Sequence, residues 1–323
     1  MFLITLSWSA LGWLGRQGTR AIAAIVFLAI ALPPIDALLK PFVTEAIFAL
    51  LCIAFLRVDL AVLRAYVSRP ALVLTATVWT SLVLPSLFGA SCLLAGLKTQ
   101  SPDLFLGLML QGIASPMMAA PAFAAVMGLD ATLVLTTLVT STAVTPFTAP
   151  LFAYAFIGPT LTLSPLVLGL KLFTMLTGSL LVAAGMRYLA GFATIRRYSD
   201  QINGLNILLV FVFVAAVMQN VATQFVLAPF TTIGIVALAF AVFFCVLVLT
   251  AIAFAKAGRD RGFVLGLMAS QRNMGLMLAV TAGVLPDVTW LYFALAQFPI
   301  YLSPFFLQPL ARRLSRSGKK TSY

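Results

Sequence analysis

The stretch GFVLGLMASQRNMGLMLAV, residues 262–280, contains three consecutive polar residues, Gln271, Arg272 and Asn273, inside an otherwise apolar run. Arg272 follows Arg261 by eleven residues, which corresponds to about 16 Å along an α-helix. That distance is about half of the roughly 30 Å hydrocarbon core of a bilayer. If this run crosses a membrane, Arg272 lies near its middle, where a charged side chain is costly and usually serves a function.

The composition of the whole chain is that of a membrane protein. Of its 323 residues, 62% are hydrophobic and 9% are charged, against about 45–50% and about 25% in soluble domains. The chain contains no histidine, which excludes His-containing catalytic triads and His-ligated metals. No nucleophile–base pair or metal cluster is visible. We therefore expect an all-α integral membrane protein that is not an enzyme, has no cofactor and binds no nucleic acid.

Apolar runs of membrane-spanning length recur along the chain, separated by short polar segments. A transmembrane helix needs about 20 mainly apolar residues. The runs predict ten transmembrane helices, at residues 20–38, 42–57, 71–95, 104–127, 131–156, 163–188, 204–222, 230–255, 262–284 and 288–310.

The basic residues indicate the orientation. Ten crossings would place both termini on one side of the membrane, and most of the 20 Lys and Arg residues fall in loops on that side. These residues are Arg16, Arg20, Arg57, Arg64, Arg69, Arg187, Arg196, Arg197, Lys256, Arg259, Arg261, Arg312, Arg313, Arg316, Lys319 and Lys320. Because basic loops stay in the cytoplasm, we predict a multi-pass protein of the cell membrane with both termini cytoplasmic.

Three segments outside the spans have their own predicted roles. Residues 1–19 are mainly apolar but lack a charged leading region, which favours an interfacial helix over a cleaved signal peptide. Residues 57–69 alternate charged and apolar residues at helical spacing and predict an amphipathic helix on the membrane surface. Residues 311–323 form a basic cytoplasmic tail.

Five spans followed by five spans suggest an internal repeat, residues 20–156 and 163–310. An odd number of spans per repeat inverts the second copy in the membrane. The halves resemble each other weakly, because Ser115, Asp130 and Pro146 are spaced much like Ser270, Asp287 and Pro299. Inverted repeats with interrupted helices are typical of secondary transporters, whose binding site lies near the midplane.

The fourth span carries two prolines near its middle, Pro116 and Pro121, preceded by Ser115. Each proline removes a backbone donor and clashes with the carbonyl one turn earlier, so two of them predict a broken helix. Backbone groups freed at this depth need protein partners or a wet cavity. The fifth span is rich in hydroxyls, including Thr142, which can bridge helices or line the same cavity.

Arg272 has no obvious acidic partner, because no Asp or Glu is expected at the same depth of the membrane. Two roles remain open. A guanidinium in a cavity suits a carboxylate ligand, which it can bind in a bidentate manner, or backbone carbonyls could satisfy it structurally. The candidate substrate-binding residues are Arg272, Asn273, Gln271, Pro116, Pro121, Ser115 and Thr142.

With these residues in hand, the chain resembles the bile acid:sodium symporter family. The resemblance covers residues of about 20 to 310 and rests on SPMMAAP at 115–121, on TSTAVTPFTAP at 140–150 after the Asp130 interval, and on RNMGL at 272–276. It implies ten spans in two inverted repeats, a panel domain and a core domain. The fourth and ninth spans would be broken and would cross each other in the core.

The chain departs from the family pattern where sodium would bind. Arg272 stands in place of a glutamine and Met268 in place of a glutamate, when Asn273 is aligned with the family's asparagine. Ala122 and Thr80 likewise replace an asparagine and a glutamine. The resemblance therefore implies that most side chains holding sodium are missing.

These observations favour one function and leave alternatives. The chain is expected to be a secondary transporter of an organic anion, a small carboxylate or a bile-acid-like molecule. It would work by alternating access, independently of sodium, with Arg272 replacing the bound cation. A sodium-coupled symporter of the same family, or a membrane sensor that binds a ligand without moving it, are the alternatives.

Overall fold

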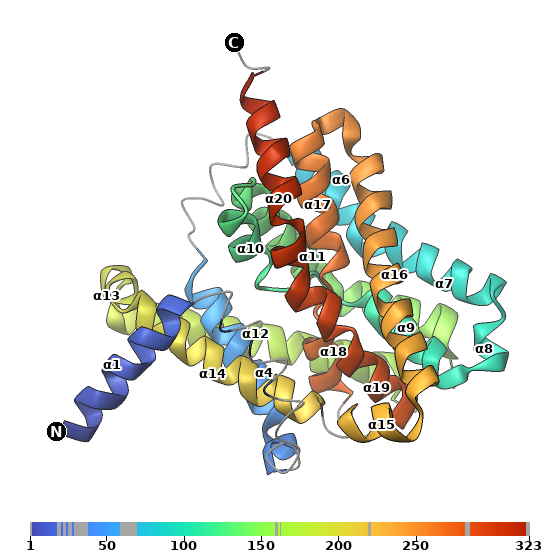
Figure 1. The fold of residues 1–323 in the computed structure, drawn as a ribbon, viewed down its shortest axis with the longest axis horizontal. Coiled ribbons are helices and arrows are strands. Elements are labelled where there is room, and N and C mark those ends of the chain that lie inside the picture. The colour runs from blue at the N-terminus through green and yellow to red at the C-terminus, as the bar shows by residue number, and fades with distance from the viewer. Residues whose placement is uncertain are drawn as a thin grey trace. The chain divides into compact units, whose positions relative to one another are not determined.

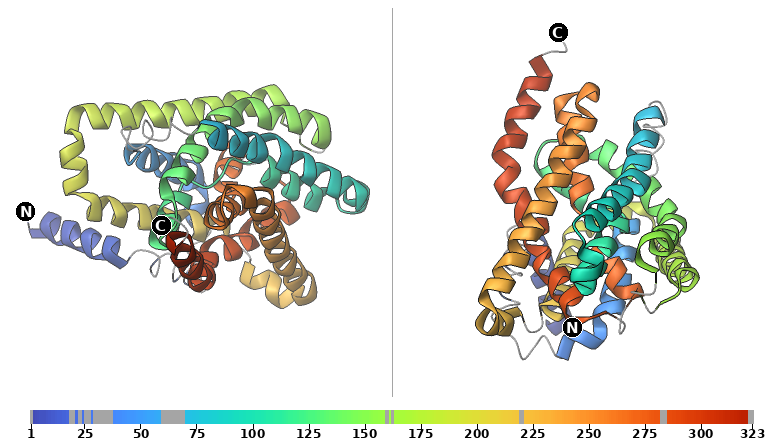
Figure 2. Two further views of the ribbon diagram at one scale, coloured as in Figure 1. Left: turned by 90° about the horizontal axis from the view of Figure 1, so that it is seen from above. Right: turned by 90° about the vertical axis from the view of Figure 1, so that its right-hand side faces the viewer.

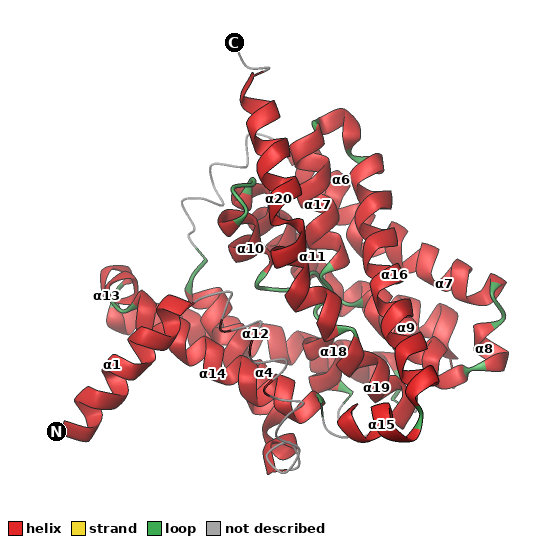
Figure 3. Cartoon of the chain, viewed as in Figure 1, coloured by secondary structure: helices red, strands yellow, loops and turns green. Residues whose placement is uncertain are grey.

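The computed structural model describes residues 2–17, 21, 24, 28, 38–58, 70–158, 161, 163–218, 221–281 and 285–320. Every regular element in these ranges is a helix, and no strand occurs among them (Figure 3). The predicted span 20–38 and the predicted surface helix at 57–69 lie almost entirely outside the described residues. The all-α prediction is thus confirmed for the described part of the chain.

The chain divides into two compact units. Unit 1 combines residues 1–58 and 174–233, and unit 2 combines residues 59–173 and 234–323. Each unit thus takes one segment from the first half of the chain and one from the second. Two long helices, α12 (Pro165–Ala190) and α16 (Pro229–Ala253), contain the boundaries between the units.

Unit 1 holds the N-terminal helix and the middle of the chain. Besides parts of α12 and α16, its helical elements are α1 (Phe2–Gln17), η1 (Lys40–Phe42), α4 (Val43–Leu56), α13 (Phe192–Arg197), α14 (Ser199–Val217) and α15 (Val221–Leu227). Helix α1 lies within the segment 1–19 that is predicted to form an interfacial helix. Helix α1 packs against the first turns of α14 (Figures 1 and 2).

Two glycines allow this close contact between α1 and α14. A Cβ atom on Gly15 would lie 1.9 Å from the Asp200 carbonyl oxygen, and one on Gly204 would lie 2.0 Å from the Leu11 carbonyl oxygen. Such distances leave no space for a side chain, so the two backbones touch directly. The N-terminal helix is thereby fixed to unit 1.

We predict that Gly15→Ala destabilises the protein. The added methyl group would overlap the backbone of α14, and overpacking of this kind costs about 1–3 kcal/mol. The thermal unfolding midpoint of purified protein measures the effect. Gly185→Ala on α12 is the matched control, because its Cβ would meet nothing within 4 Å. Equal midpoints for the two variants would contradict the predicted contact.

Unit 2 holds the remaining helical elements. They are α6 (Pro70–Val78), the π-helix η3 (Trp79–Val83), α7 (Leu84–Leu94), α8 (Leu97–Gln100), α9 (Pro102–Ile113), α10 (Ala120–Val126), α11 (Ala131–Phe152), the π-helix η4 (Ala153–Ile157), η6 (Ala255–Ala257), α17 (Arg259–Ser270), α18 (Met274–Val280), α19 (Asp287–Leu295) and α20 (Gln297–Lys320). Helices α17 and α20 lie side by side (Figure 1). Both contribute to a buried cluster that includes Met127, Phe263 and Leu307.

Local sequence explains where many of these helices begin. Helices α6, α9, α12 and α16 each start with a proline, a position where its missing N–H costs nothing. Asp130 caps α11, because its side chain accepts a 2.9 Å hydrogen bond from the Leu133 amide. Turn and cap residues thus set the helix ends more sharply than the uniformly apolar interiors do.

Six helical stretches in the described residues are long and apolar enough to cross a membrane. They are Pro70–Leu94, Ala131–Ile157, Pro165–Ala190, Ser199–Leu227, Pro229–Ala253 and Asp287–Leu314. They match six of the predicted spans to within a few residues. Ser199–Leu227 and Asp287–Leu314 are longer than the corresponding predicted spans, 204–222 and 288–310. The chain is a membrane-embedded helical protein. Of the other predicted spans, 42–57 contains the 14-residue helix α4, and 104–127 and 262–284 are interrupted.

Candidate functional site

The fourth predicted span is broken. Helix α9 ends at Ile113 and α10 begins at Ala120, and Ala114 between them is extended, with φ −63° and ψ 150°. Pro116 lies within the break, while Pro121 occupies the second position of α10, where a proline is tolerated. The two prolines therefore end one short helix and start the next, and the prediction of a break is confirmed.

The ninth predicted span is broken at the polar triplet. Helix α17 ends at Ser270 and α18 begins at Met274. Asn273 caps α18, because its Oδ1 atom accepts a 3.0 Å hydrogen bond from the Leu276 amide. The residues Gln271 to Asn273 therefore form a non-helical link rather than one face of a helix.

The two breaks cross and pair with each other. Pro116 and Arg272 form an isolated antiparallel bridge. The Met117 amide donates to the Gln271 carbonyl at 2.7 Å, and the Asn273 amide donates to the Ser115 carbonyl at 2.8 Å. Both breaks thus satisfy part of their freed backbone through each other, as the expected crossing requires.

Arg272 is fully enclosed at this crossing, with only 1% of its surface exposed. Its Nη2 atom donates to the Gly112 carbonyl at 2.6 Å and to the Thr80 carbonyl at 3.0 Å. No carboxylate in the described part of the chain forms an ion pair with it. The guanidinium therefore joins the π-helix η3 to the end of α9 through backbone oxygens alone.

Prolines explain why these two carbonyls are available. In an α-helix the Gly112 carbonyl would accept from the amide of residue 116, which is Pro116 and has no N–H. In the π-helix the Leu84 amide bonds to the Trp79 carbonyl. By the same i→i+5 pattern the Thr80 carbonyl would need the amide of residue 85, which is Pro85. Arg272 thus supplies hydrogen bonds that two prolines have removed.

The rest of the guanidinium has no acceptor. Its Nε and Nη1 atoms are buried without a hydrogen-bond partner, as are the side-chain oxygens of Ser115, Thr137, Thr142 and Gln271 among the described residues. Nε carries one N–H and Nη1 carries two, so three charged donors lack partners. Leaving a buried donor unsatisfied costs about 1–3 kcal/mol, and more for a charged group. These N–H groups are available to bind a further acceptor.

The other predicted site residues lie at different places in unit 2. The Gln271 amide nitrogen donates to Ser303 Oγ of α20 at 3.3 Å, so its side chain reaches a different helix from Arg272. Thr142 is buried on α11. Its neighbour Ser141 makes a 2.9 Å hydrogen bond between hydroxyls with Thr80, which ties α11 to η3.

The resemblance implies sodium ligands at the positions of Met268, Ala122 and Thr80. The first two of these residues are apolar. Met268 is 1% exposed and packs in an apolar cluster with Ala124 and Leu133. Ala122 is an exposed residue of α10. Thr80, by contrast, is at the centre of the arrangement, because its carbonyl accepts from Arg272.

Three residues at or near the paired breaks were not predicted from the sequence: Gly112, Gln111 and Tyr292. Gly112 provides a carbonyl for Arg272, and a Cβ at this position would lie 2.8 Å from Phe88. Tyr292 donates its hydroxyl proton to the Gln111 side-chain oxygen in the last turn of α9. The signal for Gly112 was present in the sequence, since it lies four residues before Pro116, whereas the pairing of Tyr292 with Gln111 required the three-dimensional structure.

We predict that Asn273→Ala lowers stability by about 1 kcal/mol, because losing an N-cap side chain typically costs that amount. For a chain of 323 residues the unfolding midpoint should fall by about 1.5 °C. Thr75→Ala serves as the control, since the Thr75 hydroxyl bonds only to carbonyls of its own helix, at 2.8 and 3.0 Å. An unchanged midpoint in Asn273→Ala would show that the cap is unimportant.

No protein-family model and no curated protein matches the chain. Its function is therefore best inferred from the geometry of the crossing.

Proposed function

We propose that the chain is a secondary transporter that moves an organic anion across the membrane by alternating access, without sodium. One observation supports this most directly. Arg272 lies at a crossing of two broken helices, 1% exposed, with two of its three guanidinium nitrogens lacking any acceptor. A charge of this kind inside a membrane protein typically marks a substrate or ion pathway.

The first role of Arg272 is that of a permanent cation. Unwound backbone carbonyls and the C-terminal ends of half-helices are the groups that hold sodium or protons in transporters with broken helices. Here such carbonyls, those of Thr80 and Gly112, both accept from Arg272 Nη2. A fixed guanidinium therefore provides the positive charge and the cross-link that a bound ion would otherwise provide.

The second role of Arg272 is to bind the anion. Its Nε and Nη1 donors remain unpaired, and charged N–H groups form their strongest hydrogen bonds with carboxylates and phosphates. The Ser115 hydroxyl, also buried without a partner, belongs to the backbone segment that pairs with Asn273. A small carboxylate is the ligand class that best satisfies this set of donors.

The architecture supports the same proposal. The chain forms two compact units, each built from both halves of the chain, and one unit holds both broken helices. This division fits the panel and core domains implied by the resemblance to bile acid:sodium symporters. On this proposal the chain has ten spans in two inverted repeats, at 20–156 and 163–310, with both termini cytoplasmic. Relative movement of the two units would alternate access to the crossing.

Exchange in proteoliposomes tests the proposal. A thermal-shift panel of 2-oxo and 2-hydroxy carboxylates, including pyruvate and pantoate, first selects a ligand. Vesicles loaded with that carboxylate should then accumulate the radiolabelled compound by counterflow equally well in sodium and choline buffers. Binding without counterflow would favour a sensor, and counterflow that requires sodium would favour a sodium-coupled symporter.

A further inference from the structure

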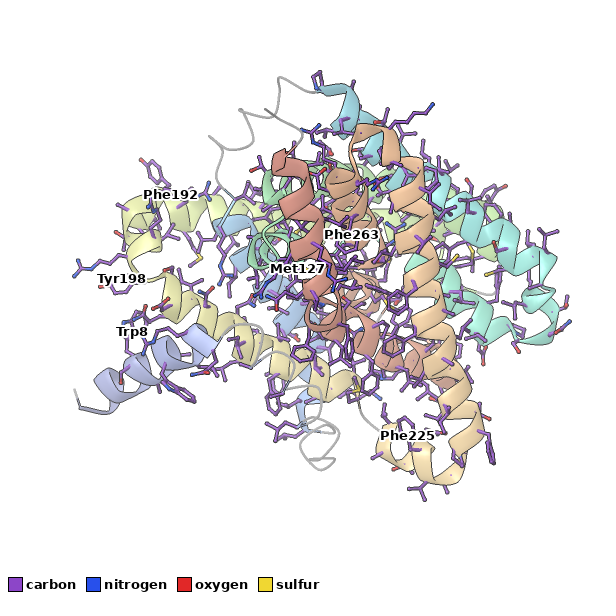
Figure 4. All side chains as sticks on the ribbon, turned by 45° about the horizontal axis from the view of Figure 1, so that its top comes forward. Trp8, Met127, Phe192, Tyr198, Phe225 and Phe263 are labelled. Atoms are coloured by element: carbon purple, nitrogen blue, oxygen red, sulfur yellow. The ribbon has the colours of Figure 1, made fainter. Side chains whose placement is uncertain are left out.

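One surface of unit 1 combines aromatic rings with arginines. We define the α1–α13 surface as Trp8 and Arg16 of α1, Arg196 and Arg197 of α13, and Tyr198 at the start of α14. Trp8 and Tyr198 meet edge to face with ring centroids 5.5 Å apart. The Arg197 guanidinium lies 5.8 Å from the centre of the Tyr198 ring. Figure 4 shows Trp8 and Tyr198 close together on adjoining elements.

These side chains are available to a partner. Trp8 is 46% exposed, and Arg16, Arg196 and Arg197 are exposed as well. The surface is also held in place, because α1 contacts α14 through Gly15 and Gly204 with no intervening side chain.

The charges on this surface are unbalanced. Arg16 lies 3.7 Å from Asp200, in an ion pair whose side chains are 60% and 47% exposed. Arg196 and Arg197 form no ion pair with any residue that the structure describes. Arg187, which contacts the Phe192 ring of α13, is bonded within unit 1 because its Nη2 atom donates to the Leu56 and Val58 carbonyls at 2.6 and 2.5 Å. A net positive charge therefore remains beside the exposed Trp8.

Tryptophan and tyrosine concentrate at the level of the lipid headgroups, and arginine clusters at that level attract anionic lipids. We propose that the α1–α13 surface binds the headgroups of anionic phospholipids, with Trp8 in the interface and Arg196 and Arg197 on the phosphates. This binding would anchor unit 1 to the membrane surface, and it does not depend on the transport function proposed above.

Thermal unfolding of the full-length protein in detergent tests this proposal. Short-chain phosphatidylglycerol should raise the unfolding midpoint by about 2–4 °C more than short-chain phosphatidylcholine does. The excess should disappear in Arg196→Gln/Arg197→Gln and remain in Arg196→Lys/Arg197→Lys. Arg312→Gln/Arg313→Gln on α20 is the matched control, with two adjacent arginines removed from unit 2, and should keep the excess.

Three results would overturn the proposal. The first is an equal shift of the unfolding midpoint with phosphatidylglycerol and phosphatidylcholine. The second is an excess shift with phosphatidylglycerol that survives in the Arg196→Gln/Arg197→Gln variant. The third is a shift with glycerol 1-phosphate, which carries the charge without the acyl chains, as large as that with phosphatidylglycerol. Because these arginines are exposed, the variants should fold normally. The unfolding midpoint of each variant without added lipid checks this.

Discussion

Replacing Arg272 by glutamine should abolish the stabilisation of the protein by carboxylates. The wild-type site presents unpaired charged donors on Nε and Nη1, and glutamine supplies neither the charge nor the donors. Truncating one partner of a buried, hydrogen-bonded charge pair costs about 2–5 kcal/mol, which corresponds to at least about a 30-fold rise in Kd. A thermal-shift titration with the selected carboxylate measures the change.

Two further variants separate the possible causes. Arg272→Lys keeps a cation near the Thr80 and Gly112 carbonyls but lacks the guanidinium's planar set of donors, so it should fold normally and bind the anion more weakly. Arg187→Gln removes an arginine in unit 1 that is also held by backbone carbonyls and should leave carboxylate binding unchanged. Full ligand stabilisation in Arg272→Gln would assign Arg272 a purely structural role.

The second large effect concerns sodium. In Arg272→Gln the Thr80 and Gly112 carbonyls lose the donor that satisfies them, and carbonyl oxygens of this kind bind alkali cations. We expect sodium to stabilise this variant but not the wild type. At a sodium concentration ten times the Kd, the gain is about 1.4 kcal/mol, or about 2 °C in the unfolding midpoint of a chain of this length.

The sodium titration is made at constant ionic strength with choline as the replacement cation. Potassium and lithium show whether the effect is selective. A sodium effect in the wild type of the same size as in the variant would contradict the idea that Arg272 occupies the place of the cation.

Much of the fold follows from patterns in the sequence. Apolar runs predict long helices such as α12 and α16 to within two residues, because only hydrocarbon-length apolar helices fit a bilayer. The breaks also follow from the sequence. Pro116 removes a helix hydrogen bond, and the polar residues Gln271–Asn273 are costly inside an apolar membrane helix. The division into two units does not, because nothing in the local sequence of α12 or α16 marks where their contacts change from one unit to the other.

The site was predictable in kind but not in detail. A buried arginine without an acidic partner could be inferred from Arg272 and the positions of the acidic residues. Its actual partners depend on which carbonyls prolines leave free, and both Pro85 and Pro116 act on residues four or five positions earlier. Side-chain direction was also hidden, since Gln271 and Arg272 are adjacent in sequence yet bond to different helices.

The most direct test of the central claim is to locate a bound anion. A structure of the protein with a bromine-substituted analogue of the selected carboxylate, in sodium-containing buffer, would show the ligand by its anomalous signal. We predict that the carboxylate lies within hydrogen-bond distance of Arg272 Nε or Nη1, while Nη2 keeps its bonds to the Thr80 and Gly112 carbonyls. A sodium ion between those carbonyls with the guanidinium displaced, or a ligand bound away from Arg272, would contradict it.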